Sequence, residues 1–294
     1  MRLISGIAKK ARDRLSAIRR ACAGQTQIAY DADSGRVLLP GRNGVPALVV
    51  PLDYEAIIPR QRSRAPFDAL QEVFERDLEG MTAFCNQLAA HLDVAGVPQL
   101  AEDGCTPHWR NDYFTGDDAR VASAIVRTFC PSQIIEIGSG HSTRFFRKAI
   151  RDGQLATRLI SVDPRPRAEI RQLVDVAEEE LLQELPLARF SDLKPGDVLF
   201  YDGSHLVFHG SDVTHFFLRV LPRVAAGVFV HVHDVFLPDE YPEHFDLRYY
   251  NEQYLLAAML MIPGLWEILA PVNYLKQRGV LPEGGCSFWM RRRT

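Results

Sequence analysis

The sequence has few cysteines and no paired cysteine motif. Its five cysteines are odd in number and scattered along the chain, and none belongs to a Cys-x-x-Cys pair: Cys22, Cys85, Cys105, Cys130 and Cys286. This spacing argues against a disulfide framework, so we expect free thiols in a reducing compartment, which favours a cytoplasmic protein. No apolar run approaches the roughly 20 residues of a membrane span. The N-terminus also lacks the apolar core of a signal peptide.

The body of the chain has fewer basic than acidic residues. The 294 residues have a net charge of −3, yet residues 1–20 contain seven Lys or Arg against one Asp, which gives +6 there and leaves −9 for the rest. An acidic body argues against a nucleic-acid-binding face. Residues 2–22 have apolar positions at helical spacing and predict a basic amphipathic helix. Such a helix either makes weak contact with a membrane surface or a partner, or is an ordinary solvated terminal helix.

A loop rich in polar and turn residues at 97–114 separates two kinds of pattern. Before it, residues 27–52 have β character around a turn at Asp33-Ser34-Gly35, and residues 67–92 have apolar positions at helical spacing. After it, helical and strand patterns alternate. We therefore predict an N-terminal basic helix and mixed cap region over residues 1–112 and a main domain over residues 113–294.

The main domain is predicted from apolar strands separated by helices. Strands are expected at 133–137, 158–162, 197–201, 227–232, 266–270 and 285–291, with helices at 117–129, 142–151, 211–222 and 251–262, while residues 165–190 are ambiguous. This alternation is typical of an α/β fold with a doubly wound, Rossmann-like sheet. The last two strands are joined by a loop with Pro and Gly rather than by a long helix, which indicates a terminal antiparallel pair.

The most informative segment is Glu136-Ile137-Gly138-Ser139-Gly140, at the end of an apolar strand. Glycines at this point allow a tight turn and the close approach of a nucleotide-like ligand. A dinucleotide site would have a third glycine and a P-loop a Gly-Lys-Ser/Thr, and neither follows. The loop therefore suits a nucleoside ligand without a pyrophosphate. Asp163 ends the second strand, where a carboxylate can accept hydrogen bonds from both ribose hydroxyls.

With these residues the chain resembles the class I S-adenosylmethionine-dependent methyltransferases over roughly residues 113–294. The segment 136–140 looks like the first motif of that family, whose backbone lies against the methionine and ribose moieties, and Asp163 looks like its ribose-binding acid. Ser142 stands where many members have a third glycine. The resemblance implies S-adenosyl-L-methionine as the cofactor. It implies a cofactor site made of Glu136, Gly138, Ser139, Gly140, Asp163 and Asp202.

Polar side chains also follow the next two strands of the predicted sheet. Asp202 and His205 come after the strand at 197–201, and His233 and Asp234 come after the strand at 227–232. Both segments emerge at the carboxyl edge, where ligands bind in doubly wound sheets. We predict a divalent metal such as Mg or Mn on Asp202, His233 and Asp234, which would lower the pKa of an acceptor hydroxyl. We assign the catalytic roles to Asp202 and to His205, the candidate general base.

This arrangement is similar to the metal-dependent O-methyltransferases of the catechol and macrolide-sugar type. Those enzymes take one acidic ligand after the fourth strand and a ligand pair after the fifth, and the catechol type carries its base three residues past the first ligand, as His205 follows Asp202. The pair usually offers two oxygens, whereas His233 offers nitrogen, which suits Mn, Fe or Zn better than Mg. Either the metal differs, or His233 is not a ligand, or Asp202, Ser204 and His205 form a hydrogen-bonded loop without a metal.

We therefore expect O-methylation of a hydroxyl on a small polar acceptor, a saccharide or a natural product. The aromatic and acidic segment 236–254 is expected to form a wall for this acceptor. Two alternatives stay open, a metal-dependent hydroxylase or hydrolase on the same scaffold and a non-catalytic nucleoside-binding or membrane-adhering module. His231 is expected to be a packed, hydrogen-bonded imidazole. A cover over the cofactor is expected from the residues before the core, Trp109, Asp112, Tyr113 and Phe114.

Overall fold

The computed structural model divides the chain into two compact units, residues 1–62 and 63–294. It describes residues 64–167, 169–246 and 248–293 of the second unit and three strands of the first. These are β1 (Ala29–Asp31), β2 (Arg36–Pro40) and β3 (Pro46–Val49), which pair in this order as an antiparallel sheet. The β character predicted for residues 27–52 is thus confirmed, whereas the predicted helix at 2–22 lies outside the described residues.

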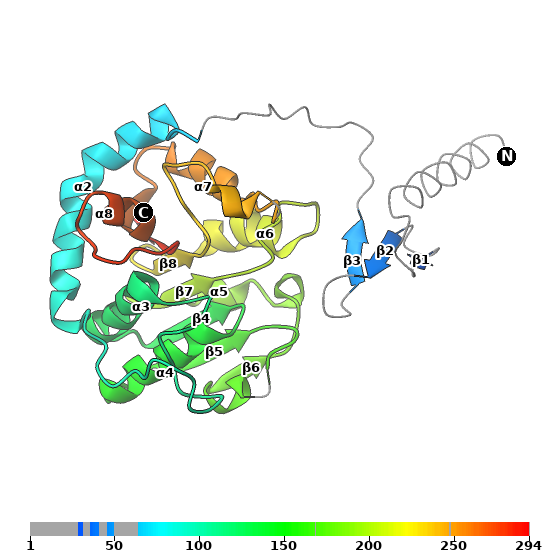
Figure 1. The fold of residues 1–294 in the computed structure, drawn as a ribbon, viewed down its shortest axis with the longest axis horizontal. Coiled ribbons are helices and arrows are strands. Elements are labelled where there is room, and N and C mark those ends of the chain that lie inside the picture. The colour runs from blue at the N-terminus through cyan, green and yellow to red at the C-terminus, as the bar shows by residue number, and fades with distance from the viewer. Residues whose placement is uncertain are drawn as a thin grey trace. The chain divides into compact units, whose positions relative to one another are not determined.

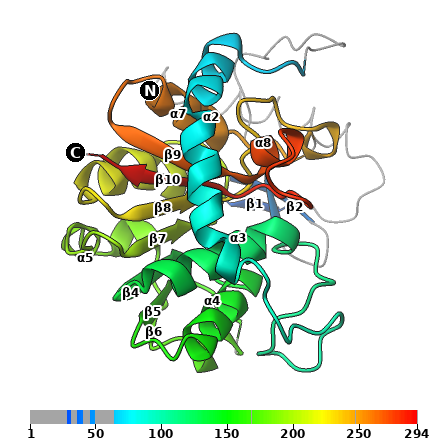
Figure 2. The ribbon, with the colours of Figure 1, turned by 90° about the vertical axis from the view of Figure 1, so that its left-hand side faces the viewer.

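The second unit is built on a seven-stranded sheet with the order β6-β5-β4-β7-β8-β10-β9 (Figures 1 and 2). Its strands are β4 (Gln133–Ile137), β5 (Arg158–Val162), β6 (Val176–Glu178), β7 (Val198–Tyr201), β8 (Phe229–Val232), β9 (Trp266–Pro271) and β10 (Phe288–Arg292). Strands β4 to β8 pair in parallel, and β10 runs antiparallel to both of its neighbours. The predicted doubly wound α/β sheet with a terminal antiparallel pair is confirmed.

Helices connect these strands. They are α2 (Asp68–Leu88), α3 (Gly116–Phe129), α4 (His141–Asp152), α5 (Ala188–Ser191), α6 (Asp212–His215), α7 (Glu252–Leu260) and α8 (Val272–Gln277). Short 3₁₀ turns lie at Ala89–His91, Ile170–Gln172, Leu182–Glu184, Leu221–Arg223 and Glu243–Phe245. Among the described helices, none has the length and apolar character needed to cross a bilayer.

Two segments differ from the pattern in the sequence. The helix predicted at 211–222 is broken into α6, a π-helical turn at Phe216–Val220 and the 3₁₀ turn at Leu221–Arg223. Pro222 has no amide hydrogen for a regular helical hydrogen bond, so the chain tightens there. The ambiguous stretch 165–190 contains β6 and three short helical turns, each too brief to show a period in the sequence.

Helix α2 packs on the sheet unit rather than standing apart from it. Figure 2 shows it crossing in front of the sheet on the same side as α3, and it contacts both α3 and β9. One face is buried, with Leu70, Phe74, Met81, Phe84 and Leu88 in the common core. Residues 63–112, which we assigned to the cap region, therefore lie in the same compact unit as the sheet.

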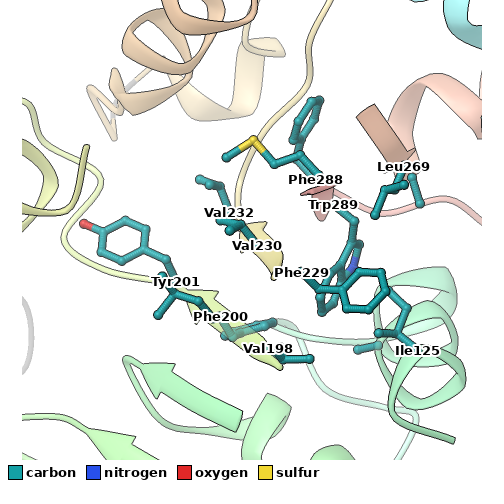
Figure 3. Packing of buried hydrophobic residues seen from close by; sticks show 14 of the residues in the cluster. Ile125, Val198, Phe200, Tyr201, Phe229, Val230, Val232, Leu269, Phe288 and Trp289 are labelled. Atoms are coloured by element: carbon teal, nitrogen blue, oxygen red, sulfur yellow. The ribbon is translucent and has the colours of Figure 1, made fainter. Parts of the chain in front are cut away.

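The core lies between the sheet and these helices (Figure 3). Phe200 on β7 stacks on the His231 ring of β8 with centroids 3.8 Å apart, and Trp289 of β10 covers the other side at 4.8 Å. His231 is fully buried, its Nε2 is 2.9 Å from the Ser287 hydroxyl, and burial holds its pKa well below the usual value. The prediction of a packed, hydrogen-bonded His231 is confirmed. This rigid floor fixes the strand ends that carry the polar residues described next.

Candidate functional site

The glycine loop (Gly138, Ser139 and Gly140) follows β4 directly. Gly138 has a φ of +79°, and a Cβ there would lie 1.8 Å from the carbonyl oxygen of Asp202. Only glycine fits such a contact, because the left-handed φ and the close backbone both disfavour a side chain. The amide of Gly138 donates to Val162 O and that of Asp202 donates to Ile137 O. The ends of β4, β5 and β7 are therefore locked together by main-chain bonds.

Glu136 lies beneath this loop and is fully buried. Its two carboxylate oxygens accept hydrogen bonds of 2.6 Å from the hydroxyls of Ser142 and Thr143 in the first turn of α4. Burial raises the pKa of Glu136 to about 8, against the opposing effect of those hydroxyls. The amide of Gly140 donates to the Thr143 hydroxyl. Glu136 thus stabilises the turn between β4 and α4. Ser142, at the position where many family members have a third glycine, donates one of the two hydrogen bonds.

Asp163 contacts the glycine loop from the end of β5. One carboxylate oxygen accepts from both the amide and the hydroxyl of Ser139, at 3.1 and 2.7 Å, and the other accepts from the amide of Arg165. A cavity of about 350 Å³ opens beside these residues. It brings together Gly138, Asp163 and Asp202 with a wall from the 3₁₀ turn after β6 and with Asp212 of α6. The wall residues are Leu181, Leu182 and Gln183. They fall in the ambiguous stretch 165–190, so the sequence did not predict them.

Asp212 stabilises the turn after β7, which lines the cavity. Its carboxylate accepts from the Tyr201 hydroxyl at 2.9 Å and from the amide and hydroxyl of Ser204 at 2.8 and 2.5 Å. Gly203 fits between them, since a Cβ there would lie 2.3 Å from both the Tyr201 hydroxyl and the Asp212 carboxylate. The turn that presents Asp202 to the cavity is therefore rigidly held.

A second group, the carboxylate–imidazole cluster, consists of Asp202, His205, His233, Asp234 and Glu252. His205 is at its centre: Nε2 lies 3.3 Å from Asp202 Oδ1 and 3.5 Å from Asp234 Oδ2, and Nδ1 lies 2.7 Å from Glu252 Oε1. The ring of Tyr250 stacks on His205 at 4.1 Å. His205 and Asp234 both have left-handed backbones, with φ of +62° and +54°, which turn these side chains out of the strand direction. The structure therefore brings together all four residues that the sequence placed at this edge.

His233 stands between two sets of ligand atoms. Its Nδ1 lies 3.7 Å from Asp202 Oδ1 and 3.8 Å from Asp234 Oδ1. Its Nε2 faces the other way, 3.7 Å from Asp118 Oδ2 and 3.6 Å from the sulfur of Cys286. Asp118 belongs to the first turn of α3, and Cys286 comes just before β10. The His233 imidazole thus joins the cluster to the start of α3 and to the segment before β10.

The cluster has a strong preference for positive charge. Burial lowers the pKa of His205, but its hydrogen bonds to Asp202 and Glu252 outweigh this and raise the pKa to about 10. Burial likewise opposes the charged form of His233, while Cys286, Asp202 and Asp118 beside it raise its pKa well above the usual value. Opposite charges at such distances favour the charged form of each group. The three carboxylates of the cluster therefore stabilise imidazolium ions or another cation placed among them.

The cluster also satisfies a basic test for a metal. Asp202, His233 and Asp234 each offer one ligand atom, and these atoms all lie within 4.8 Å of one another. The donors are two carboxylate oxygens and one imidazole nitrogen, a set that suits a divalent ion of the Mn or Zn type and, through its oxygens, Mg. These three residues could therefore hold the metal that the sequence predicts.

Three residues at the cluster were missed in the sequence. Asp118, Glu252 and Cys286 reach it from α3, α7 and the segment before β10, and both acids lie in the first turn of their helices. Acids are common in first turns because they interact favourably with the helix dipole, so nothing in the sequence distinguishes these two. Cys286 appears there only as one of five scattered thiols.

The segment before α3 differs from its expected role as a cover. Phe114 is buried, with its ring 5.5 Å from His233 and 5.7 Å from Phe200. Trp109 packs on Phe145. Tyr113 alone of these aromatics is exposed, at 67%, and it stacks on the ring of His141 next to the glycine loop. Covering the cofactor is thus a role open to Tyr113 but not to the buried Phe114.

Part of this chain is similar to known proteins. Residues 135–235 match the family model of a methyltransferase domain. No curated protein matches the chain. Among solved structures, the SAH-bound methyltransferase PaMTH1 of Podospora anserina is 16% identical with a TM-score of 0.42, over 80% of this chain and 100% of that one. A branched-chain polyamine synthase of Thermus thermophilus is 13% identical with a TM-score of 0.37, over 82% of this chain and 72% of that one.

The family match runs from β4 to the loop after β8. It therefore contains the glycine loop, Asp163, the Asp202 turn and the His233-Asp234 pair, which the sequence had singled out and the fold gathers at one edge of the sheet. Residues 135–235 are thus identified as a methyltransferase domain, in agreement with the resemblance to the S-adenosylmethionine-dependent methyltransferases.

Proposed function

We propose that the chain methylates a hydroxyl group of a small polar acceptor, a saccharide or a natural product, with S-adenosylmethionine as the donor and a divalent metal at Asp202, Asp234 and His233. One observation carries this proposal. Asp202 lines the cavity beside the glycine loop and also contacts His205 in the carboxylate–imidazole cluster. This one residue therefore borders both half-sites, the cavity for the cofactor and the cluster for the acceptor. A donor in the cavity and an acceptor at the cluster would then be neighbours.

The cavity suits the nucleoside part of the cofactor. Its volume of about 350 Å³ falls in the range of small-molecule pockets. Asp163 is in place to accept hydrogen bonds from ribose hydroxyls, and Gly138 keeps the backbone open for close approach. Leu181 and Leu182 supply an apolar surface for a base. When bound, the cofactor would supply a methyl group already activated on a sulfonium sulfur, so the chain has mainly to align the acceptor.

His205 is the residue we assign to proton transfer. The Glu252 carboxylate accepts the Nδ1 proton, which leaves Nε2 facing the acceptor side between Asp202 and Asp234. Without a metal, Asp202 and Glu252 raise the pKa of His205 to about 10, so the ring is an imidazolium at neutral pH. A divalent cation on Asp202 and Asp234 would offset the negative charge around the ring and lower this pKa, and Nε2 could then take the hydroxyl proton as a general base. A divalent cation held by Asp202 and Asp234 would lower the pKa of that hydroxyl.

The acceptor wall is narrower than the sequence segment 236–254 implied. Tyr241 and Phe245 are buried and pack on each other, so they support the wall from within. Tyr249 is 71% exposed, and Tyr250 lies on the face of His205. Tyr250 thus offers aromatic surface beside the base, and the exposed Tyr249 follows directly before it in the chain, which suits a ring-shaped polar acceptor such as a sugar.

Calorimetric titration of the metal-stripped protein with S-adenosylhomocysteine tests the cofactor site first. We expect micromolar binding by the wild type and at least tenfold weaker binding by Asp163→Asn, since the amide offers one acceptor oxygen in place of two. His205→Gln should leave this affinity within about twofold. Absence of binding by the folded wild type would contradict the assignment and favour the non-catalytic alternative.

Turnover then tests His205. With a panel of catechol and sugar acceptors and Mn²⁺ or Mg²⁺, His205→Gln should lower the rate of S-adenosylhomocysteine release by about 10²–10⁴-fold. His209→Gln is the matched control, because His209 is exposed and lies only four residues away. The product mass distinguishes the rivals: a methyl gain supports the proposal, and an oxygen or water gain supports a hydroxylase or hydrolase.

A further inference from the structure

A second set of ligand atoms lies behind the carboxylate–imidazole cluster. The sulfur of Cys286, Nε2 of His233 and Oδ2 of Asp118 form a nearly equilateral triangle with edges of 3.6, 3.7 and 3.8 Å. Asp118 and His233 are buried and Cys286 is half-buried. A fourth atom, Asp234 Oδ1, lies 3.2 Å from the sulfur. None of the steps assigned to methyl transfer uses Asp118 or Cys286.

The size of this triangle matches a tetrahedral metal. Zinc binds sulfur at about 2.3 Å and nitrogen or oxygen at about 2.0–2.2 Å, and tetrahedral angles then place the ligand atoms roughly 3.3–3.6 Å apart. The observed edges exceed these values by a few tenths of an ångström at most. The three side chains therefore need little movement to close on an ion.

The three ligands are also held in place by the backbone. The Asp118 carboxylate accepts the amides of Cys286 and Ser287 at 3.0 and 2.7 Å, which ties the segment before β10 to the start of α3. The carbonyl of Cys286 accepts the amide of Val235, two residues after His233. Ligands fixed by such supporting bonds form tighter metal sites than ligands on free loops.

We propose that Asp118, His233 and Cys286 form a binding site for Zn²⁺, with Asp234 or water as the fourth ligand. A thiolate, an imidazole and a carboxylate form a typical zinc donor set and a poor one for Mg²⁺. On binding, the Cys286 thiol gives up its proton to solvent and the metal takes its place at the sulfur. The site shares His233 with the metal ligands proposed for methyl transfer, but Asp118 and Cys286 belong to it alone, so a test on Cys286 can fail without the proposed function failing.

Zinc at this site would fix the position of the remaining proton on His233 in the neighbouring cluster. With zinc on Nε2, His233 keeps its other proton on Nδ1, which faces Asp202 Oδ1 and Asp234 Oδ1. His233 would then be a hydrogen-bond donor to these carboxylates rather than a metal ligand beside them. With water as the fourth zinc ligand, Asp202 and Asp234 would be left as an oxygen-only site, which suits Mg²⁺, and the metal proposed for methyl transfer would be held without His233.

Cobalt substitution tests the site in the full-length chain. Co²⁺ added to the metal-stripped wild type should give an intense thiolate-to-cobalt charge-transfer band that saturates at one equivalent and is removed by one equivalent of Zn²⁺. Cys286→Ser should lose the band. Cys105→Ser, a half-exposed thiol, and Asp202→Asn, from the other ligand set, should both keep it. A folded wild type without the band, or a band that survives in Cys286→Ser, would overturn the proposal.

X-ray absorption of the zinc-loaded wild type gives an answer that needs no variant. We expect one sulfur scatterer at about 2.3 Å for each zinc. A shell of nitrogen and oxygen alone would place the ion at Asp202 and Asp234 and refute the assignment to Cys286.

Discussion

The glycine loop and the carboxylate–imidazole cluster lie side by side at the carboxyl edge of the same sheet, yet their polar groups are satisfied in opposite ways. Around the loop, the acids accept from neutral donors, as Asp163 does from Ser139 and Glu136 from Ser142. In the cluster, the acids face imidazoles, as Glu252 and Asp202 face His205. The loop is complete without a counter-charge, whereas the cluster needs a cation at its centre.

This difference indicates what each half-site selects. A cavity whose hydrogen bonds are already balanced fits the uncharged ribose and base of a cofactor. A group of carboxylates selects positive charge, whether an imidazolium, a metal ion or an acceptor proton in transit. The contact between Gly138 and the Asp202 carbonyl is where the two regions meet. Three substitutions test how separate these regions are.

Gly138→Ala should cause the largest change, because it disrupts the contact between the glycine loop and the Asp202 turn. The new Cβ would lie 1.8 Å from Asp202 O at a φ of +79°, so the loop or the Asp202 turn must move. We expect a loss of at least about 2–4 kcal/mol in the free energy of unfolding, measured by urea denaturation. Gly196→Ala is the matched control, since Gly196 has a φ of +92° and a Cβ there would meet no atom of the described residues within 4 Å, its chain neighbours apart. It should cost about 1–2 kcal/mol from backbone strain alone. Equal losses in the two variants would rule out the contact as the cause.

Glu252→Gln should change the cluster and leave the loop intact. Removing this charge takes away one of the two carboxylates that raise the pKa of His205 to about 10. The pKa should fall by about 1–3 pH units, as followed by NMR titration of the imidazole, while S-adenosylhomocysteine affinity stays the same. Glu243→Gln, on the exposed surface before α7, should alter neither property. An unchanged His205 pKa would show that Glu252 does not position this ring.

Glu136→Gln should have the mildest effect on the geometry of the two regions, and it appears in the pH dependence of stability. Because burial raises the pKa of Glu136 to about 8 from 4.5, the folded protein keeps a proton that the unfolded chain loses. Its contribution is full below pH 4.5 and is lost as the pH rises through 8. The free energy of unfolding should therefore fall less steeply over this window in the variant, by up to about 1.4 kcal/mol per pH unit.

The control for that comparison is Glu72→Gln, since Glu72 is exposed on α2. Its curve of unfolding free energy against pH should run parallel to that of the wild type. A Glu136→Gln curve that also runs parallel would mean that Glu136 is ionised in the folded protein at neutral pH.

The sequence predicts well what depends on neighbouring residues. Strands β4 and β5 have the bounds expected from their apolar runs. The glycine loop spans only a few residues, and its contact with Asp163 joins residues that are 24 positions apart in the sequence. The cluster depends on packing between distant elements, and the contact of His205 with Glu252 crosses 47 positions. Asp202 and Asp234 could be placed because parallel strands end at one edge. Asp118 and Cys286 could not, because their approach depends on how α3 and β10 pack.

The order of strands has a consequence for the newly made chain. Strand β10 pairs with β8 on one side and β9 on the other, although it follows both in the sequence. During synthesis from the N-terminus, β8 and β9 therefore leave the ribosome before the strand that joins them, and each waits with an unpaired edge. The same late segment brings Cys286 to His233. The surroundings of His233 are thus completed among the last steps of folding, and a nascent chain halted before residue 286 would present an open sheet edge to chaperones.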